Sequence, residues 1–429
     1  MIKAIIRFSA ESRYLVIAAT IMMLLGSLWS MRNIPLDALP DLSDTQVIVY
    51  SRWDRSPDII EDQVTYPIIT SLLGAPKVKA IRGFSDFGFS YVYVIFEDGT
   101  DMYWARTRVL EYLSKITPQL PRDVRTELGP DATSVGWVYQ YALVDKTGQH
   151  SSDELRSYQD WYLRYALQSV SGVSEVATVG GQVRQYQVTV DPNALASYKL
   201  PLEAVIGAVK SGNDDVGGRL VEISGREYMV RGRGYVKKIG DIENLVLRAE
   251  GGTPVLVKDV ARVALGPELR RGIADFDGQG DVVGGIVVMR SGENALNVIE
   301  RVKAKVEDLK PSLPKGVEVV TTYDRSELIN AAIDTVREKL IEEIIVVSII
   351  ILIFLWHIPS ALIPIITIPV SVALAFIPMY AMGLNANLMS LAGIAISIGV
   401  LVDGAIVEVE NAYNKIHHWI QDGKQGDFH

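Results

Sequence analysis

Four long apolar segments constrain this chain more than any other feature of its sequence. One lies close to the N-terminus and three follow one another toward the C-terminus: residues 14–31, 340–356, 361–382 and 388–409. Each approaches the roughly 20 residues that a helix needs to cross a bilayer, although the purely apolar part of the second is somewhat shorter. We therefore predict four transmembrane helices, with one large soluble insert between the first and the second.

The fourth segment contains a carboxylate. Asp403 lies in a run that is otherwise apolar, and a charged side chain at the bilayer centre costs roughly 2.5 kcal/mol or more. This favours a proton or ion relay with a partner on another helix; the alternative is a carboxyl that stays neutral and hydrogen-bonds a neighbouring helix. Ala392, Ala395 and Gly399 share the face of Asp403 at helical spacing, and such small residues let a second helix approach closely.

The basic residues predict the orientation. Lys3, Arg7 and Arg13 precede the first apolar segment, which indicates a cytoplasmic N-terminus and an insert on the outside. The chain then turns in the cytoplasm at residues 357–359, and its tail, with Lys415 and Lys424, ends inside. The first segment is long for a signal peptide and no small-x-small cleavage site follows it, so we predict an uncleaved anchor.

Composition excludes several classes of function. The net charge of −9 argues against nucleic acid as a partner. Without cysteine the insert has no disulfide and the chain no thiolate ligand, and the five histidines show no ligand spacing. No nucleotide-binding pattern is present, which indicates an energy source other than ATP, and no cofactor is predicted.

The insert shows an α/β pattern with a rough internal repeat. Three stretches each combine a strand pattern with a helical one: residues 91–96 with 105–113, residues 186–190 with 202–209, and residues 284–289 with 295–309 and a final strand at 317–321. These predict split βαβ, ferredoxin-like subdomains, unless the similarity is a coincidence of ordinary α/β segments. Residues 217–267 predict an inserted β-rich subdomain. The predicted fold class is an α+β membrane protein with a transmembrane helix bundle.

Five motifs carry a resemblance to a known family. They are PLDALPDLSD at 35–44, QVTYP at 63–67, RGFS at 82–85, LGPDAT at 128–133 and VDGAIV at 402–407. The chain resembles, over its whole length, the inner-membrane permeases of resistance–nodulation–division (RND) pumps, in the heavy-metal efflux group. The resemblance implies a proton-driven antiporter rather than an enzyme, in the Gram-negative inner membrane. It also implies a homotrimer with a periplasmic adaptor and an outer-membrane channel, and Asp403 matches the proton-relay aspartate of the family.

The resemblance also implies a domain plan: residues 1–33 as N-terminus and first transmembrane helix, 34–135 as a first periplasmic porter subdomain, 136–335 as a second one with a docking subdomain inserted at about 180–270, 336–411 as transmembrane helices 2–4, and 412–429 as a cytoplasmic tail. Permeases of the family consist of two similar halves. We interpret the chain as an N-terminal fragment of one, whose second half would supply the partner of Asp403 and the periplasmic metal ligands.

The metal is the least determined part of the resemblance. Residues 136–140 look like the copper/silver branch, and divalent-metal members tend to place Glu where Trp137 stands. Met389 matches the first rung of a transmembrane methionine ladder, but Leu401 and Glu408 occupy two further rungs. Because thioethers suit Cu(I) and Ag(I), we expect these cations. A divalent-metal permease (Zn, Co, Cd or Ni), a drug-type pump and a non-transporting, membrane-anchored binding or scaffold fragment are the alternatives.

Overall fold

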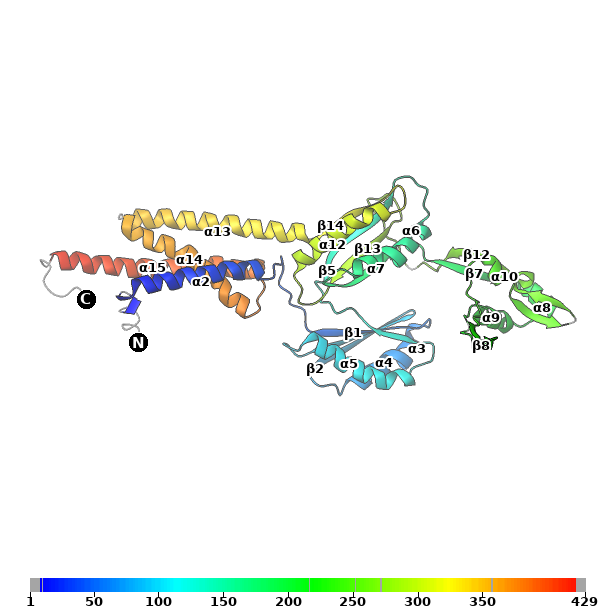
Figure 1. The fold of residues 1–429 in the computed structure, drawn as a ribbon. Coiled ribbons are helices and arrows are strands. Elements are labelled where there is room, and N and C mark those ends of the chain that lie inside the picture. Colours follow the sequence, from blue (N-terminus) through cyan, green and yellow to red (C-terminus); the bar gives the residue numbers. More distant parts are fainter. Residues whose placement is uncertain are drawn as a thin grey trace.

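The computed structural model describes residues 8–9, 11–215, 217–250, 252–270, 272–355 and 358–421. Long helices occupy one end of the molecule and a series of α/β units the other (Figure 1). Lys3, Arg7 and Lys424, whose charges support the predicted orientation, lie outside these ranges. Of the predicted turn at 357–359, residue 357 lies outside them, and residues 358 and 359 begin a helix.

Four helices form the bundle. They are α2 (Arg13–Asn33), α13 (Arg325–Leu355), α14 (Ile358–Ala381) and α15 (Leu388–Gln421), and α14 contacts the other three. Among the described residues, α2, α14 and α15 are long and apolar enough to cross a membrane. Ser27 of α2 is fully buried and its Oγ donates to the carbonyl of Ala373 in α14, so a small polar residue allows these two helices to pack closely. The first, third and fourth predicted spans therefore correspond to candidate spans.

α13 differs from the predicted second span. It begins at Arg325 instead of residue 340, because residues 325–339 contain no Gly or Pro that would end a helix. Its apolar part is preceded by charged residues, among them Glu338, Lys339, Glu342 and Glu343. The described part of α13 is therefore not among the helices that are long and apolar enough to cross a membrane. Its predicted end at residue 356 lies outside the described residues.

The first α/β unit is a four-stranded antiparallel sheet in the order β2-β3-β1-β4. Helical segments cover one face, as Figure 1 shows, and Val49, Val92, Val94 and Val109 are fully buried in its core. In chain order the elements are β1 (Gln46–Arg52), α3 (Pro57–Ile60), η1 (Glu61–Thr65), α4 (Tyr66–Leu72), β2 (Val78–Asp86), β3 (Phe89–Phe96), α5 (Met102–Ile116), η2 (Thr117–Gln119) and β4 (Arg125–Leu128).

The second unit repeats this topology. Its sheet has the order β14-β5-β13-β6, again antiparallel, so both units have the β-α-β-β-α-β plan of the predicted ferredoxin-like fold. In each, a π-helical turn interrupts the first helix. The elements are β5 (Trp137–Asp145), α6 (Ser152–Tyr158), η3 (Gln159–Leu163), α7 (Arg164–Gln168), β6 (Val173–Gly180), β13 (Val283–Met289), α12 (Ala295–Leu309), η4 (Lys310–Ser312) and β14 (Val317–Asp324).

The predicted three copies are therefore wrong in number. Residues 186–190 were expected to begin a separate unit, but β7 pairs with β12 outside both sheets, and β6 pairs with β13. The second predicted copy thus belongs to an insertion between β6 and β13. The third predicted copy, β13 with α12 and β14, is the second half of the unit that begins at β5.

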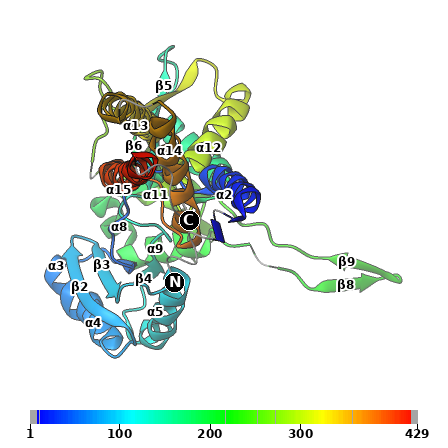
Figure 2. The ribbon, with the colours of Figure 1, turned by 90° about the vertical axis from the view of Figure 1, so that its left-hand side faces the viewer.

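The insertion extends away from the two sheets (Figure 1), and the hairpin of β8 and β9 projects sideways from it (Figure 2). It mixes helices with two-stranded ladders instead of being simply β-rich, around a small core of Ile242, Val257 and Val263. Its elements are β7 (Arg184–Val190), α8 (Pro192–Tyr198), α9 (Leu202–Ser211), β8 (Leu220–Ile223), β9 (Arg226–Met229), α10 (Ile239–Glu243), β10 (Val246–Glu250), β11 (Thr253–Leu256), α11 (Val257–Val260) and β12 (Ala261–Pro267).

Candidate functional site

α15 begins at Leu388 because two side chains cap it reciprocally. The Asn387 N–H donates to Ser390 Oγ at 2.9 Å, and the Ser390 N–H donates to Asn387 Oδ1 at 3.0 Å. This arrangement satisfies N–H groups that a helix start leaves without an intrahelical partner. The cap fixes where α15 begins, and so fixes how far along the helix axis Met389 and Asp403 lie.

One face of α15 packs on the other helices through large aliphatic side chains. Its buried residues are Leu391, Ile394, Ile398, Val402 and Val409. Ile398 and Val402 belong to a cluster with Ile351 of α13 and Ile368 of α14. This face therefore holds α15 in the bundle.

Asp403 lies on a different side of α15. Its neighbours at helical spacing, Ala392 and Gly399, are exposed as Asp403 is, and Ala395 is half-buried. A Cβ placed on Gly399 or on Gly404 would have nothing within 4 Å. Within the described part of the chain, the predicted small-residue face is therefore open, and α2, α13 and α14 do not cover it.

Met389 occupies the first turn of α15 and is 65% exposed. Leu401 and Glu408 lie further along the same helix, also exposed. Among the described residues, no group of three or more His, Asp or Glu side chains is arranged to hold a metal ion. The candidate residues of the bundle are thus the thioether of Met389 near the start of α15 and the carboxylate of Asp403 about 21 Å further along the helix axis.

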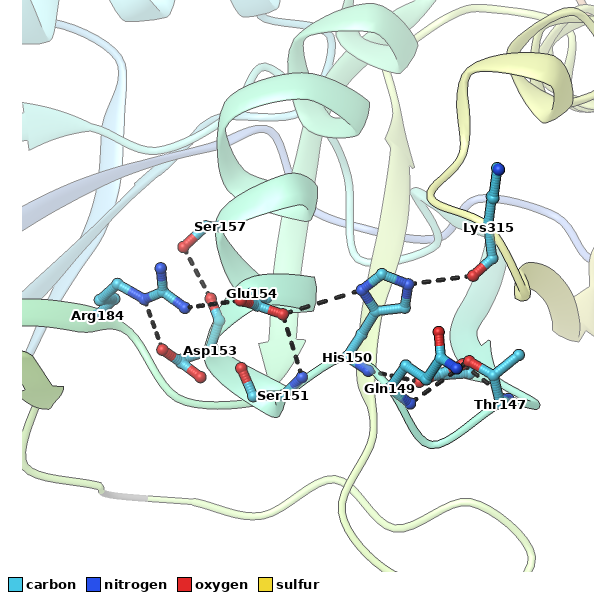
Figure 3. Close-up of polar contacts among 10 residues, drawn as sticks. Thr147, Gln149, His150, Ser151, Asp153, Glu154, Ser157, Arg184 and Lys315 are labelled. Carbon is cyan, nitrogen blue, oxygen red and sulfur yellow. Dashed lines mark hydrogen bonds and ion pairs between the residues drawn. The ribbon is translucent and has the colours of Figure 1, made fainter.

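A cluster of polar and charged side chains lies beside the second sheet (Figure 3). Asp145 accepts hydrogen bonds from the hydroxyl of Thr147 (2.6 Å) and from the N–H groups of Thr147 and His150 (both 2.8 Å). These bonds lower the pKa of Asp145 to about 2. His150 Nε2 lies 3.1 Å from the carbonyl oxygen of Lys315, and its Nδ1 lies 3.9 Å from Glu154 Oε2.

The remaining charges of this cluster are also paired. Arg184 of β7 lies 2.5 Å from Asp153 and 3.6 Å from Glu154, both in α6. Because the groups satisfy one another, we interpret the cluster as the attachment of the first strand of the insertion to the second unit.

Sequence reasoning gave no separate role to Asp131, which joins the two units. Its carboxylate accepts hydrogen bonds from Tyr103 of α5 at 3.0 Å and from Ser174 of β6, and it lies 3.5 Å from Arg290 Nε. Burial alone would raise its pKa, but the bonds from Ser174 and Tyr103 outweigh burial and hold the pKa of Asp131 below its ordinary value. The LGPDAT motif contains Asp131, but its partners Tyr103, Ser174 and Arg290 lie elsewhere in the sequence, so the motif alone could not indicate this role.

The comparison with known families decides where this architecture belongs. The family described as AcrB/AcrD/AcrF matches residues 5–426. The chain belongs to the AcrB/AcrD/AcrF family. The resemblance to RND permeases that the motifs predicted is therefore confirmed.

Several cation efflux members of the AcrB/AcrD/AcrF family are similar to this chain. The putative cation efflux system protein SilA of Salmonella typhimurium and the cation efflux system protein CusA of Escherichia coli are each 53% identical over 421 residues, 98% of this chain and 40% of the relative. The cobalt-zinc-cadmium resistance protein CzcA of Cupriavidus metallidurans is 37% identical over 426 residues, 97% of this chain and 40% of CzcA. The chain thus spans about 40% of the length of these curated relatives.

A solved member of this structural group agrees with the fold. An X-ray crystal structure of a heavy metal efflux pump superposes with a TM-score of 0.85 at 34% identity, and the superposition covers 97% of this chain and 41% of the pump chain. As a member of the AcrB/AcrD/AcrF family, the chain is a membrane protein with three candidate spans among its described helices.

Proposed function

We propose that this protein takes part in the proton-driven export of heavy-metal cations, with Cu(I) or Ag(I) as the cargo. The observation that carries the proposal is the position of Asp403, a carboxylate on the open small-residue face of an apolar helix. The 53% identity to two cation efflux proteins over 98% of the chain supports a cationic cargo.

Asp403 supplies a proton-binding group where a bilayer would otherwise offer none. The hydrocarbon core of a bilayer is about 30 Å thick, so a helix that enters at Leu388 carries Asp403 about three quarters of the way across. A proton that moves inward across the membrane releases about 2.3 kcal/mol per 100 mV. Its binding neutralises the carboxylate, and this changes which arrangement of the helices has the lowest free energy.

We propose that Asp403 pairs with a cationic side chain. This side chain would belong to the part of the relatives' length that this chain does not span. The open face formed by Ala392, Gly399 and Gly404 supports this, because small residues permit close approach of another helix. Release of the proton restores the charge and the ion pair. The two states of Asp403 then alternate between two packings of that face.

Two residues support Cu(I) or Ag(I) over a divalent cation. Trp137, at the start of β5, stands where divalent-metal permeases tend to have Glu, and Met389 offers a thioether, which suits soft monovalent ions. The identity falls from 53% for SilA and CusA to 37% for the cobalt-zinc-cadmium resistance protein. We therefore place divalent cations second.

The proposed setting is the inner membrane of a Gram-negative bacterium, in a homotrimer with a periplasmic adaptor and an outer-membrane channel. In this setting α13 supplies the second of four membrane spans, although its charges at residues 338–343 put only its C-terminal part at bilayer depth. We assign the two ferredoxin-like units as periplasmic porter subdomains and the insertion between β6 and β13 as the docking subdomain.

The test of the proton role is a chimera in which residues 1–429 replace the corresponding 40% of CusA. Asp403→Asn in this chimera should abolish copper and silver tolerance at unchanged protein level, because amide cannot take up and release a proton at this position. Glu410→Gln, an exposed carboxylate seven residues further along α15, is the matched control and should retain tolerance. Normal tolerance in Asp403→Asn would refute the relay.

The test of the cargo uses two equally exposed methionines. Met389 and Met382 are both 65% exposed, but only Met389 matches a rung of the ladder. In the same chimera Met389→Ile should lower copper and silver tolerance while Met382→Ile does not. Tolerance to cobalt, zinc or cadmium instead would favour the divalent alternative. Adaptor binding by the purified chain without any metal-coupled proton flux in proteoliposomes would favour a scaffold.

A further inference from the structure

The segment that follows α2 lies between the helix bundle and the second α/β unit. Leu36 packs against two separate hydrophobic clusters, one formed by α14 and α15 and one formed by the second sheet with α12 and α13. On either side of Leu36, Ile34 belongs to the bundle cluster and Ala38 to the sheet cluster. This short stretch therefore touches both bodies.

The same stretch is hydrogen-bonded to the start of α15. Leu36 and Ala386 form a parallel β-bridge. The Ala386 N–H donates to the carbonyl of Pro35 at 2.9 Å, the Asp37 N–H to the carbonyl of Ala386 at 3.2 Å, and the Leu388 N–H to the carbonyl of Ala38 at 3.2 Å. Because Leu388 is the first residue of α15, a shift of this helix along its axis displaces residues 35–38.

Asp37 also binds the second unit through Arg325. Arg325 Nη2 lies 2.8 Å from Asp37 Oδ1, and the Arg325 side chain is only 5% exposed. That contact is ionic and lacks hydrogen-bond geometry, whereas Arg325 Nη1 donates to the carbonyl of Val135. A buried guanidinium that loses its carboxylate is strongly destabilised, because the charge is then left unpaired. The pair is therefore held together.

Arg325 stands where β14 becomes α13 without any loop, since β14 ends at Asp324 and α13 begins at Arg325. Asp324 accepts a hydrogen bond from the Ser326 N–H at 2.9 Å and pairs with Lys303 of α12. Burial alone would raise the pKa of Asp324, but the bonds from Lys303 and Ser326 hold it below the ordinary value. The first turn of α13 is thus fixed to both the sheet and α12.

We propose that the Asp37–Arg325 ion pair is the joint through which α15 moves the second sheet: α15 displaces residues 35–38 by their hydrogen bonds, and Asp37 passes the displacement to Arg325, β14 and α13. Asp37 and Arg325 are positioning residues in this scheme. The inference rests on the proposed role of Asp403, because protonation of that carboxylate is what moves α15.

The test measures amide hydrogen exchange in the full chain in lipid nanodiscs. Asp403→Asn fixes the uncharged form, and it should change the exchange rates of the β14 amides by about threefold or more, since exchange reports local opening. Asp37→Asn should abolish this response. Asp44→Asn is the matched control: Asp44 lies in the same motif and pairs with Lys79 at 3.2 Å, but both side chains are about half exposed. The response to Asp403→Asn should persist in it.

Each outcome of this experiment either supports or contradicts the proposed joint. If Asp403→Asn still alters β14 in the Asp37→Asn background, or alters nothing there in the parent chain, the joint is wrong. In either case the proposed function is judged separately by the metal tolerance of the chimera. If Asp37→Asn loses protection throughout the second sheet, Arg325→Gln replaces it. That variant removes the positive charge that Asp37 pairs with, and a preserved response in it overturns the joint.

Discussion

Gly180 ends β6 at the point where the chain leaves the second sheet for the insertion. Its φ of +68° lies in the left-handed region, and a Cβ at this position would lie 1.9 Å from the carbonyl oxygen of Val282 and 2.7 Å from Ala274 Cβ. The Val282 N–H donates to the carbonyl of Ala274 at 2.8 Å, and Arg156 donates to the carbonyl of Gly180 at 2.6 Å. None of these backbone groups can move away without breaking a hydrogen bond.

Gly180→Ala therefore combines two penalties. The left-handed conformation costs a residue with a Cβ about 1–2 kcal/mol, and overpacking against fixed neighbours adds about 1–3 kcal/mol. We expect a total loss of about 2–5 kcal/mol. Gly148, in the loop after β5, separates the two penalties: its φ is +66°, but a Cβ there meets nothing within 4 Å. Gly148→Ala should lower the local stability only by the cost of the left-handed backbone conformation, about 1–2 kcal/mol.

The assay is amide exchange of β6 and β13 in the purified chain, from which the free energy of local opening follows. These strands pair in register from Val283 with Gly180, so the exchange of their amides should rise far more in Gly180→Ala than in Gly148→Ala. Equal effects of the two substitutions would refute the reasoning, because the clash with Val282 would then contribute nothing.

Two further predictions concern the two units and their cores. Because the pKa of Asp131 is lower in the folded protein than its ordinary value, its stabilising contribution is complete above about pH 5 and is lost as the pH falls below about 4. Urea unfolding at pH 7 and at about pH 2.5 should therefore show a smaller acid-dependent loss for Asp131→Asn, which itself costs about 1–3 kcal/mol at pH 7. An unchanged pH dependence in that variant would contradict the assignment. Ile299→Ala, at a fully buried position of α12, should lower the free energy of unfolding by about 2–5 kcal/mol, whereas the same change at the exposed Glu300 should stay within about 0.5 kcal/mol; comparable losses would show that α12 does not pack as described.

Local patterns predicted local structure well. The helix predicted at residues 295–309 has those bounds in the structure, since its apolar residues recur at helical spacing and Asn294 caps it. The strands predicted at 91–96 and 317–321 lie within β3 and β14. The apolar length of α2, α14 and α15 identified them, because a helix that crosses a bilayer needs about 20 consecutive, mostly apolar residues.

Pairing between distant segments could not be predicted in the same way. The residues of β7 read as a strand but carry no signal for their partner, so the sequence was divided into three repeats where the structure has two. The extension of α13 back to Arg325 was missed because its polar first turns were assigned to the soluble insert. For the candidate site, periodicity placed Asp403 on a small-residue face, whereas the contact of Asp37 with Arg325 depends on how three separate parts of the chain meet.

The insertion departs from the second sheet between two strands that are direct neighbours. In the first unit the equivalent strands, β2 and β3, are separated only by Phe87 and Gly88, a gap that a tight hairpin turn closes. In the second unit the same gap opens into the chain from Gly181 to Val282, whose ends lie side by side because Gly180 pairs with Val283. Extra length at such a place leaves the ladder of hydrogen bonds intact. An insertion at this place can therefore vary in length and in what it contacts while the fold of the second sheet stays the same.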